Sequence, residues 1–183
     1  IPRMLKLAVI GALDISNRQF FKTSISMFKI RPTNLVCHGV PPIMVRDFDT
    51  ISVVIPTCGR TVETLSRAVK SVKAQQYAPQ EIIVVDDNKN NFLLSQELQK
   101  FCALNQLKYI SSGGCGGGGA RNCGITNATC KYVAFLDDDD EWLPNKLKVQ
   151  LGLFTSSSIG LVYSRGYKVK VNADGTKTQT AYV

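Results

Sequence analysis

The chain has 183 residues, of which 44% are hydrophobic and 20% charged. This length suits one domain with a sizeable core and an added segment. The composition excludes wholesale disorder, collagen and a coiled coil, and no apolar run reaches the roughly 18–20 residues of a membrane-spanning helix. The 22 Lys and Arg against 14 Asp and Glu give a net charge of +8, which favours anionic partners. Because aromatic residues are not interleaved with the basic ones, we expect no nucleic acid among these partners.

The single histidine, His38, excludes a His-rich zinc site, and we expect it to be structural or exposed. None of the six cysteines belongs to a C-x-x-C pair, which argues against a zinc ribbon. They are Cys37, Cys58, Cys102, Cys115, Cys123 and Cys130. A chain long enough to build a core needs no disulfide scaffold, so we expect reduced thiols and a cytoplasmic protein. The chain opens with Ile-Pro-Arg-Met and carries no secretory signal, and we expect a fragment.

Residues 1–50 differ from the rest of the chain in their weak hydrophobic periodicity. Pro32, Pro41 and Pro42 interrupt any regular element there. We therefore divide the chain into an appended N-terminal segment of unknown role, residues 1–50, and one domain, residues 51–183.

From residue 51, short apolar runs alternate with amphipathic helical patterns. Strands are expected over residues 51–55, 81–87, 107–110, 132–136, 159–164 and 167–171, with a hairpin turn over 172–175. Helices are expected over residues 62–72, 93–104, 120–128 and 144–154. The alternation predicts an α/β fold with βαβ crossovers around a mainly parallel sheet. Such sheets bind ligands beyond the carboxyl ends of their strands, where the unusual residues of this chain lie.

Five of the fourteen acidic residues are contiguous, from Asp137 to Glu141, directly after an apolar strand. Their mutual repulsion must be offset by a cation or by strong hydrogen-bond donors. Mg²⁺ and Mn²⁺ prefer oxygen ligands and often bind through one or two carboxylates together with substrate phosphates. The run therefore indicates a metal and phosphate site. Acids are also favoured at a helix start, a role open to Asp140 and Glu141.

A glycine run extends from Gly113 to Gly119 and leads into Arg121 at a helix start. Glycine lets backbone approach a ligand closely, a helix N-terminus favours an anion, and arginine offers a charged fork suited to a diphosphate. We interpret the run as one wall of a phosphate site, with a flexible loop as the alternative.

Gly114, Gly116 and Gly119 also satisfy G-x-G-x-x-G, with Asp137 following at roughly the spacing of a dinucleotide-binding site. This pattern keeps an NAD-dependent oxidoreductase as an alternative. In a run of glycines the match carries little information, and a ribose needs one acid rather than four.

Asp86 and Asp87 end the second expected strand. Their carboxylates can accept hydrogen bonds from a nucleobase or from loop backbone. The alternative is that they cap the turn before Asn88.

Four stretches, in this order, resemble the family 2 glycosyltransferases of the GT-A fold. They are Val53-Val-Ile-Pro-Thr57, Ile83-Val-Val-Asp-Asp87, Gly119-Ala-Arg-Asn122 with Gly124, and Phe135-Leu-Asp-Asp-Asp-Asp-Glu-Trp142 followed by Pro144. The resemblance covers about residues 51–171 and leaves the first 50 residues outside.

The resemblance implies a GT-A type, Rossmann-like α/β/α sandwich that takes part in polysaccharide biosynthesis. It implies transfer of a sugar from a nucleoside diphosphate sugar, with a UDP-sugar as the expected donor, with inversion and with help from Mn²⁺ or Mg²⁺. The implied nucleotide-binding residues are Thr57, Asp86, Asp87, Arg121 and Asp137, and the implied metal ligands are Asp139 and Asp137. A metal on the diphosphate stabilises the charge that develops on the leaving group.

The chain departs from the family pattern at two places. Cys58 stands where the family commonly has an aromatic residue that packs on the base, which leaves the base in doubt. Asn88 and Lys89 replace residues that are usually small.

An inverting transferase also needs a general base, which the family supplies as a carboxylate well downstream of the acidic motif. Beyond Glu141 this chain has one acid, Asp174, in the expected hairpin turn. The catalytic residue is therefore unknown, and we expect a donor-binding domain that is truncated before its acceptor-binding half.

We expect the acceptor to be a saccharide or a lipid-linked sugar. The basic surplus is compatible with peripheral association at the inner membrane surface. The alternatives to a transferase are a non-catalytic nucleotide-sugar-binding or interaction module and, less favoured, the oxidoreductase.

Overall fold

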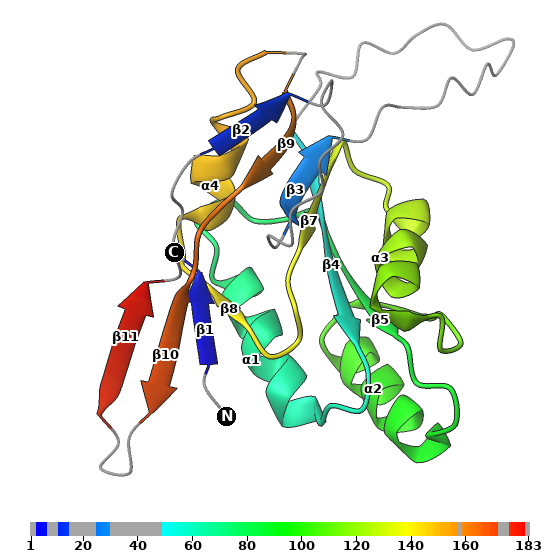
Figure 1. Ribbon diagram of the computed structural model, residues 1–183. Coiled ribbons are helices and arrows are strands. Elements are labelled where there is room, and N and C mark those ends of the chain that lie inside the picture. Colours follow the sequence, from blue (N-terminus) through cyan, green and yellow to red (C-terminus); the bar gives the residue numbers. More distant parts are fainter. Residues whose placement is uncertain are drawn as a thin grey trace, which may run out of the picture.

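The computed structural model describes residues 3–6, 11–14, 25–29, 49–156, 159–171 and 176–181. His38, Cys37, Asp174 and the expected turn over 172–175 lie outside these ranges. The described strands form two sheets, one of seven strands and one of four (Figure 1). Among the described helices, none has the length and apolar character needed to cross a membrane.

The larger sheet has the strand order β2-β9-β3-β7-β4-β5-β6. Its strands are β2 (Gly11–Asp14), β9 (Ile159–Tyr163), β3 (Ile25–Lys29), β7 (Tyr132–Phe135), β4 (Ile51–Thr57), β5 (Glu81–Asp86) and β6 (Lys108–Ser111). The neighbours β7, β4, β5 and β6 pair in parallel. Both β7 and β9 are antiparallel to β3, so β9 shares the direction of the parallel four, and five of the seven strands run one way. The predicted mainly parallel sheet is confirmed.

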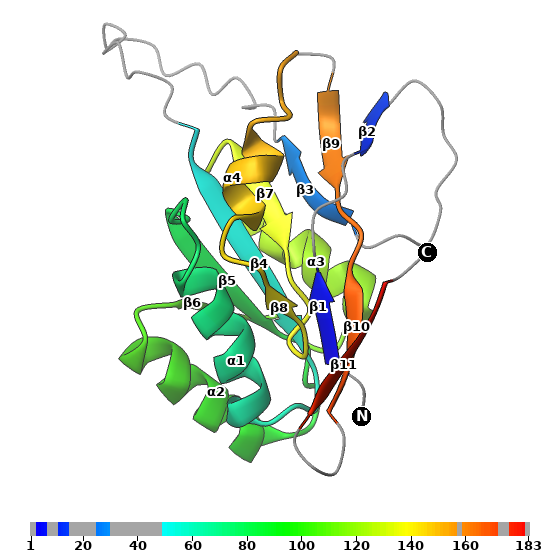
Figure 2. The same ribbon diagram turned by 90° about the vertical axis from the view of Figure 1, so that its left-hand side faces the viewer.

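Helices cover both faces of this sheet, as Figure 2 shows. One face carries α1 (Val62–Lys73), α2 (Phe92–Leu104) and the short α4 (Lys146–Leu151), and the other carries α3 (Gly116–Asn127). The predicted α/β/α sandwich is therefore confirmed.

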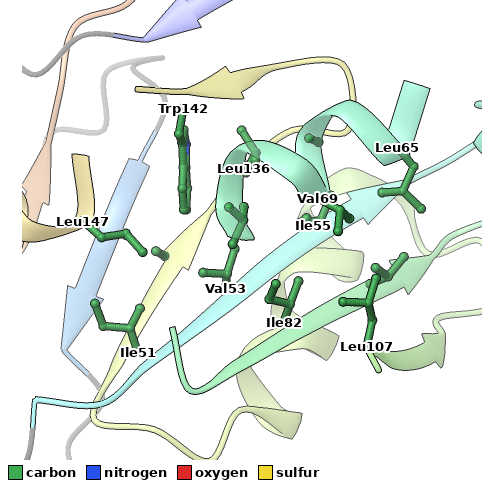
Figure 3. Packing of buried hydrophobic residues seen from close by; sticks show 14 of the residues in the cluster. Ile51, Val53, Ile55, Leu65, Val69, Ile82, Leu107, Leu136, Trp142 and Leu147 are labelled. Atoms are coloured by element: carbon green, nitrogen blue, oxygen red, sulfur yellow. The ribbon is translucent and has the colours of Figure 1, made fainter. Parts of the chain in front are cut away.

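The alternation of side chains along β4 builds both cores. Ile51, Val53 and Ile55 face α1 and α2 in the larger cluster, part of which is drawn in Figure 3. Val54 faces α3 in the smaller cluster. A strand buried on both faces must be apolar at successive positions, which explains the continuous apolar run in the sequence.

The smaller sheet has the order β11-β10-β1-β8. It contains β11 (Lys177–Ala181), β10 (Tyr167–Val171), β1 (Arg3–Lys6) and β8 (Glu141–Trp142). The antiparallel pairing of β10 with β11 agrees with the predicted hairpin. The short β8 begins at Glu141, the last acid of the run, and pairs in parallel with β1.

Three strands before residue 50 pair with strands from the rest of the chain. β1 lies between β10 and β8, and β3 lies between β9 and β7. Met27 on β3 is fully buried in the larger core cluster. The division of the chain at residue 50 stays a sequence prediction.

Two helices, α3 and α4, differ from their predicted ranges by more than one residue at an end. α3 begins at Gly116, within the glycine run, instead of near Ala120. The Asp87 carboxylate, from the loop after β5, accepts the N–H groups of Cys115 and Gly116 at this helix start. α4 covers only Lys146–Leu151 of the expected range 144–154.

Candidate functional site

The parallel pairing brings three strand ends to one edge of the larger sheet. Thr57 at the end of β4 is in register with Asp86 at the end of β5. On the other side of β4, Val54 is in register with Phe135 at the end of β7, one residue before Leu136 and two before Asp137. The loops that carry the predicted site residues therefore adjoin one another.

Thr57 is 2% exposed, and its carbonyl oxygen accepts the Asp87 N–H at 2.9 Å. Its hydroxyl lies near Asp138 and lowers the pKa of that carboxyl, yet it makes no hydrogen bond of regular geometry. Buried polar atoms are normally paired, so this hydroxyl is a group that a ligand or a water molecule could satisfy.

Asp86 is fully buried, and both of its oxygens are used within the protein. Oδ1 accepts the Asn88 N–H at 3.0 Å as well as the Asn88 side-chain amide, and Oδ2 accepts the Tyr109 hydroxyl at 2.7 Å. Burial and this carboxylate together raise the pKa of Tyr109 to about 12. These are the contacts of the turn-capping alternative, and the nucleotide-binding role of Asp86 stays a prediction.

Asp87 binds the glycine run. Its Oδ1 accepts the Ser112 hydroxyl at 2.6 Å and the Cys115 N–H at 2.8 Å, and its Oδ2 accepts the Gly116 N–H at 2.9 Å. The hydrogen bond from Ser112 is the largest cause that lowers the pKa of Asp87; burial opposes it, and the Cys115 and Gly116 donors lower it further. The N-terminus of α3 thus already holds a carboxylate.

The glycines are needed there for conformational reasons. Gly113 and Gly114 have φ values of 72° and 80°, in the region that L side chains rarely adopt. A Cβ on Gly114 would also lie 2.8 Å from Cβ of Lys89, so the loop packs closely on that side chain.

Two residues that depart from the family pattern also contact this loop system. The Cys58 thiol lies 3.6 Å from the carbonyl oxygen of Asp87, in hydrogen-bond contact. Asn88 Oδ1 accepts the Gly59 N–H at 2.8 Å and so joins the loop after β4 to the loop after β5. In the sequence Asn88 was a departure from the family pattern. In the structure its side-chain amide links the loops that follow the neighbouring strands β4 and β5.

Arg121 connects the glycine run with the acidic run. Its Nη1 donates to the carbonyl of Gly117 at 2.9 Å, and its Nη2 lies 2.5 Å from Asp137 Oδ1. The structure therefore brings these two predicted nucleotide-binding residues together.

The acidic run contains carboxylates of two kinds. Asp137 and Asp139 are half-exposed, each with 42% of the side chain accessible, whereas Asp138 and Asp140 are buried. Burial raises the pKa of Asp138; Thr57 lowers it, and the nearby charges act in both directions. Asp137 and Asp139 are therefore more accessible to a ligand than Asp138 and Asp140.

Arg60 is a site residue that the sequence reasoning missed. Its Nη2 lies 3.1 Å from Asp139 Oδ2, and its Nε lies 3.9 Å from Asp138 Oδ1. One feature of the sequence could have indicated Arg60: it is a basic residue that follows β4 closely, and β4 ends at the same sheet edge as the acidic run.

Asp137 and Asp139 fit a divalent cation in donor chemistry, because carboxylate oxygens are what Mg²⁺ and Mn²⁺ prefer. Among the described residues, no three His, Cys, Asp or Glu side chains are grouped to hold a metal ion. The pair suits an ion that is shared with ligand phosphates better than an ion held by protein alone. Their role as metal ligands stays a prediction.

The fold and the site define an α/β protein whose candidate ligand site lies at the carboxyl edge of a mainly parallel sheet. Residues 52–182 match the family described as Glycosyl transferase family 2, and the chain belongs to this family. The resemblance seen in the sequence motifs is confirmed.

Three similar proteins are named as glycosyltransferases or glucosyltransferases. An uncharacterized glycosyltransferase of Rickettsia conorii is 32% identical over 133 residues, which are 72% of this chain and 21% of the relative. The Escherichia coli UDP-Glc:alpha-D-GlcNAc-diphosphoundecaprenol beta-1,3-glucosyltransferase WfgD is 30% identical, over 62% of this chain and 44% of the relative. The Campylobacter jejuni GalNAc(5)-diNAcBac-PP-undecaprenol beta-1,3-glucosyltransferase is 40% identical, over 53% of this chain and 32% of the relative.

Among solved structures, Staphylococcus aureus TarS 1-349 in complex with UDP superposes with a TM-score of 0.42 and 29% identity, over 55% of this chain and 30% of that chain. The chain spans about a fifth of the Rickettsia relative, at 21% of its length.

Proposed function

We propose that this chain is the donor-binding part of a glycosyltransferase that takes a sugar from a nucleoside diphosphate sugar, with a UDP-sugar as the donor. The observation that carries the proposal is the meeting of Thr57, Asp87, Arg121, Asp137 and Asp139 at one sheet edge. Membership in the glycosyl transferase family 2 supports it and leaves the oxidoreductase alternative without support. Metal assistance and inversion at the sugar are part of the proposal.

The residues divide between the two ends of a nucleoside diphosphate. On the base side, Asp87 Oδ2 accepts the Gly116 N–H and has a second lone-pair site that a nucleobase N–H can use. On the diphosphate side, the guanidinium of Arg121 lies between the glycine run and Asp137. Asp137 and Asp139 would hold Mn²⁺ or Mg²⁺, which would supply positive charge for the leaving diphosphate.

The proposed acceptor is a saccharide on a diphosphate-linked lipid. The Escherichia coli and Campylobacter jejuni relatives are both named for acceptors of this kind. The net charge of +8 supports approach to such an anionic acceptor or to an anionic membrane surface, which suits a cytoplasmic protein that associates peripherally with the inner membrane.

A titration with UDP, GDP, dTDP, CMP and NAD, each with and without Mn²⁺, tests the donor site. We expect one nucleoside diphosphate to bind and to raise the melting temperature, with Mn²⁺ strengthening the effect. Binding of NAD without metal, or of none of the five, would contradict the proposal.

A second candidate is a non-catalytic nucleotide-sugar-binding or interaction module. The observation behind it is that residues 142–183 contain one acid, Asp174, as a candidate carboxylate base. Assaying the full-length gene product beside the 183-residue chain separates the two candidates. Donor binding in both with transfer only in the longer protein supports the transferase, whereas binding without transfer in either supports the module.

A further inference from the structure

Arg60 forms ion pairs with carboxylate oxygens of the acidic run, including those of Asp139, which a cation in this site would also bind. Its guanidinium is 3.1 Å from Asp139 and 3.9 Å from Asp138. The contact with Asp139 joins residues 79 positions apart, so it is made by the fold and not by local sequence. Asp137 likewise forms an ion pair with an arginine, Arg121. Asp137 and Asp139, the two half-exposed aspartates of the run, therefore each have an arginine as a partner.

The backbone near Arg60 is fixed, while its side chain reaches solvent. The Gly59 N–H donates to Asn88 at 2.8 Å, which holds the loop against its neighbour. The Arg60 side chain is 44% exposed and ends in the ion pair. Exposed ion pairs are weak, and arginine binds phosphate as readily as carboxylate. The guanidinium can therefore exchange Asp139 for another anion without disturbing the fold.

We propose that Arg60 is a resident counter-ion of Asp139, that a divalent cation and a nucleoside diphosphate displace it together, and that the released guanidinium then binds the diphosphate. The inference rests on the proposed function and adds a residue to it. A cation alone must compete with the guanidinium for Asp139. When the diphosphate is present, Arg60 gains an anionic partner as it leaves the carboxylate. Metal and nucleotide therefore strengthen each other's binding by the same factor.

The test measures Mn²⁺ affinity by calorimetry, with and without UDP, in the native chain and in Arg60→Ala, Arg60→Lys and Lys100→Ala. Lys100 is exposed on α2 and controls for the loss of one positive charge. Circular dichroism confirms that each variant is folded.

In Arg60→Ala we expect Mn²⁺ alone to bind about two- to fivefold more tightly, since a competing exposed ion pair of ordinary strength is gone. The factor by which UDP raises Mn²⁺ affinity should shrink. Arg60→Lys keeps the charge and should leave Mn²⁺ affinity near the native value, while UDP binding weakens because lysine lacks the planar fork. Lys100→Ala should match the native chain.

Unchanged or absent Mn²⁺ binding in Arg60→Ala would overturn the proposal, as would an equal gain in Lys100→Ala. Failure of the proposed function gives a different pattern. If no nucleoside diphosphate binds the native chain, the donor-site assignment falls, and the diphosphate role of Arg60 falls with it. A gain in Mn²⁺ affinity in Arg60→Ala would then still support the counter-ion role.

Discussion

Asp87 closes the first turn of α3, although it precedes Gly116 by 29 residues: its Oδ2 accepts the Gly116 N–H at 2.9 Å. The first N–H groups of a helix lack partners within the helix and attract anions. Here the Asp87 carboxylate, just after β5, accepts the Gly116 N–H and also hydrogen bonds from the Ser112 hydroxyl and the Cys115 N–H. The glycine run is therefore held by the protein's own charge, and an anionic ligand at this helix end must share these donors with Asp87.

Asp87→Ala is expected to lower the free energy of unfolding by about 1–3 kcal/mol, because the part-buried hydrogen bonds from the Cys115 and Gly116 N–H groups lose their charged acceptor. Urea denaturation measures the change. Glu97→Ala, on the exposed side of α2, is the control and should have little effect. Equal stability of the two variants would show that the glycine run is held by other contacts.

Gly124→Ala is expected to destabilise the packing of α3 on the sheet. A Cβ at this position would lie 2.3 Å from Cγ1 of Val54, which is buried in β4 and cannot move aside cheaply. We expect the free energy of unfolding to fall by about 1–3 kcal/mol, as in other overpacked cores.

Gly118→Ala is the matched control on the same helix. A Cβ there meets nothing within 4 Å, so alanine should raise the free energy of unfolding by about 0.5–1 kcal/mol. A similar loss of stability in both variants would contradict the close approach of Gly124 to β4.

Glu81 is expected to make stability depend on acid pH. It accepts hydrogen bonds from Ser52 Oγ at 2.6 Å and from Thr129 N at 2.7 Å. Burial alone would raise its pKa and is the largest single effect, but the donors from Ser52 and Thr129 and the charge of Lys108 together outweigh it, so the pKa of Glu81 is lowered. Its contribution is present above the unfolded-state pKa of about 4.3 and is lost as the pH falls through the lower folded-state pKa.

Thermal melts between neutral pH and about pH 3 measure this dependence on either side of the unfolded-state pKa. Glu81→Gln should flatten the acid limb, and Glu97→Gln should retain it. An acid limb as steep in Glu81→Gln as in the native chain would rule out this residue as a source of the dependence.

Asp139→Ala is expected to weaken nucleotide binding in the presence of Mn²⁺ by about 10–100-fold, the size of effect seen even for residues that only support metal ligands. Binding without metal should not weaken, because the loss of Asp139 frees the guanidinium of Arg60 for the diphosphate. Asp49→Ala is the control: Asp49 also forms an ion pair, with Lys131 at 3.3 Å, but it lies just before the amino end of β4. Equal affinities for the Mn²⁺–nucleotide pair in both variants would defeat the assignment of Asp139.

The amino-acid sequence by itself determined the family and most of the elements after residue 51, although it did not indicate the short strand β8. The continuous apolar runs of β4, β5 and β7 and the helical spacing of Leu65, Val69 and Val72 are local signals, because each depends only on neighbouring positions in the sequence. Three of the four motifs lie where these strands end, and the fourth, from Gly119 to Gly124, lies in α3.

Only the tertiary structure decided which of these residues meet. The position of β3 between β7 and β9, the attachment of Asp87 to the glycine run and the pairing of Arg60 with Asp139 all join distant parts of the chain. Sequence periodicity shows which face of a segment is buried and where a strand ends. It does not show strand order in a sheet or which of several exposed charges pair, because both depend on contacts that form only when the chain has closed on itself.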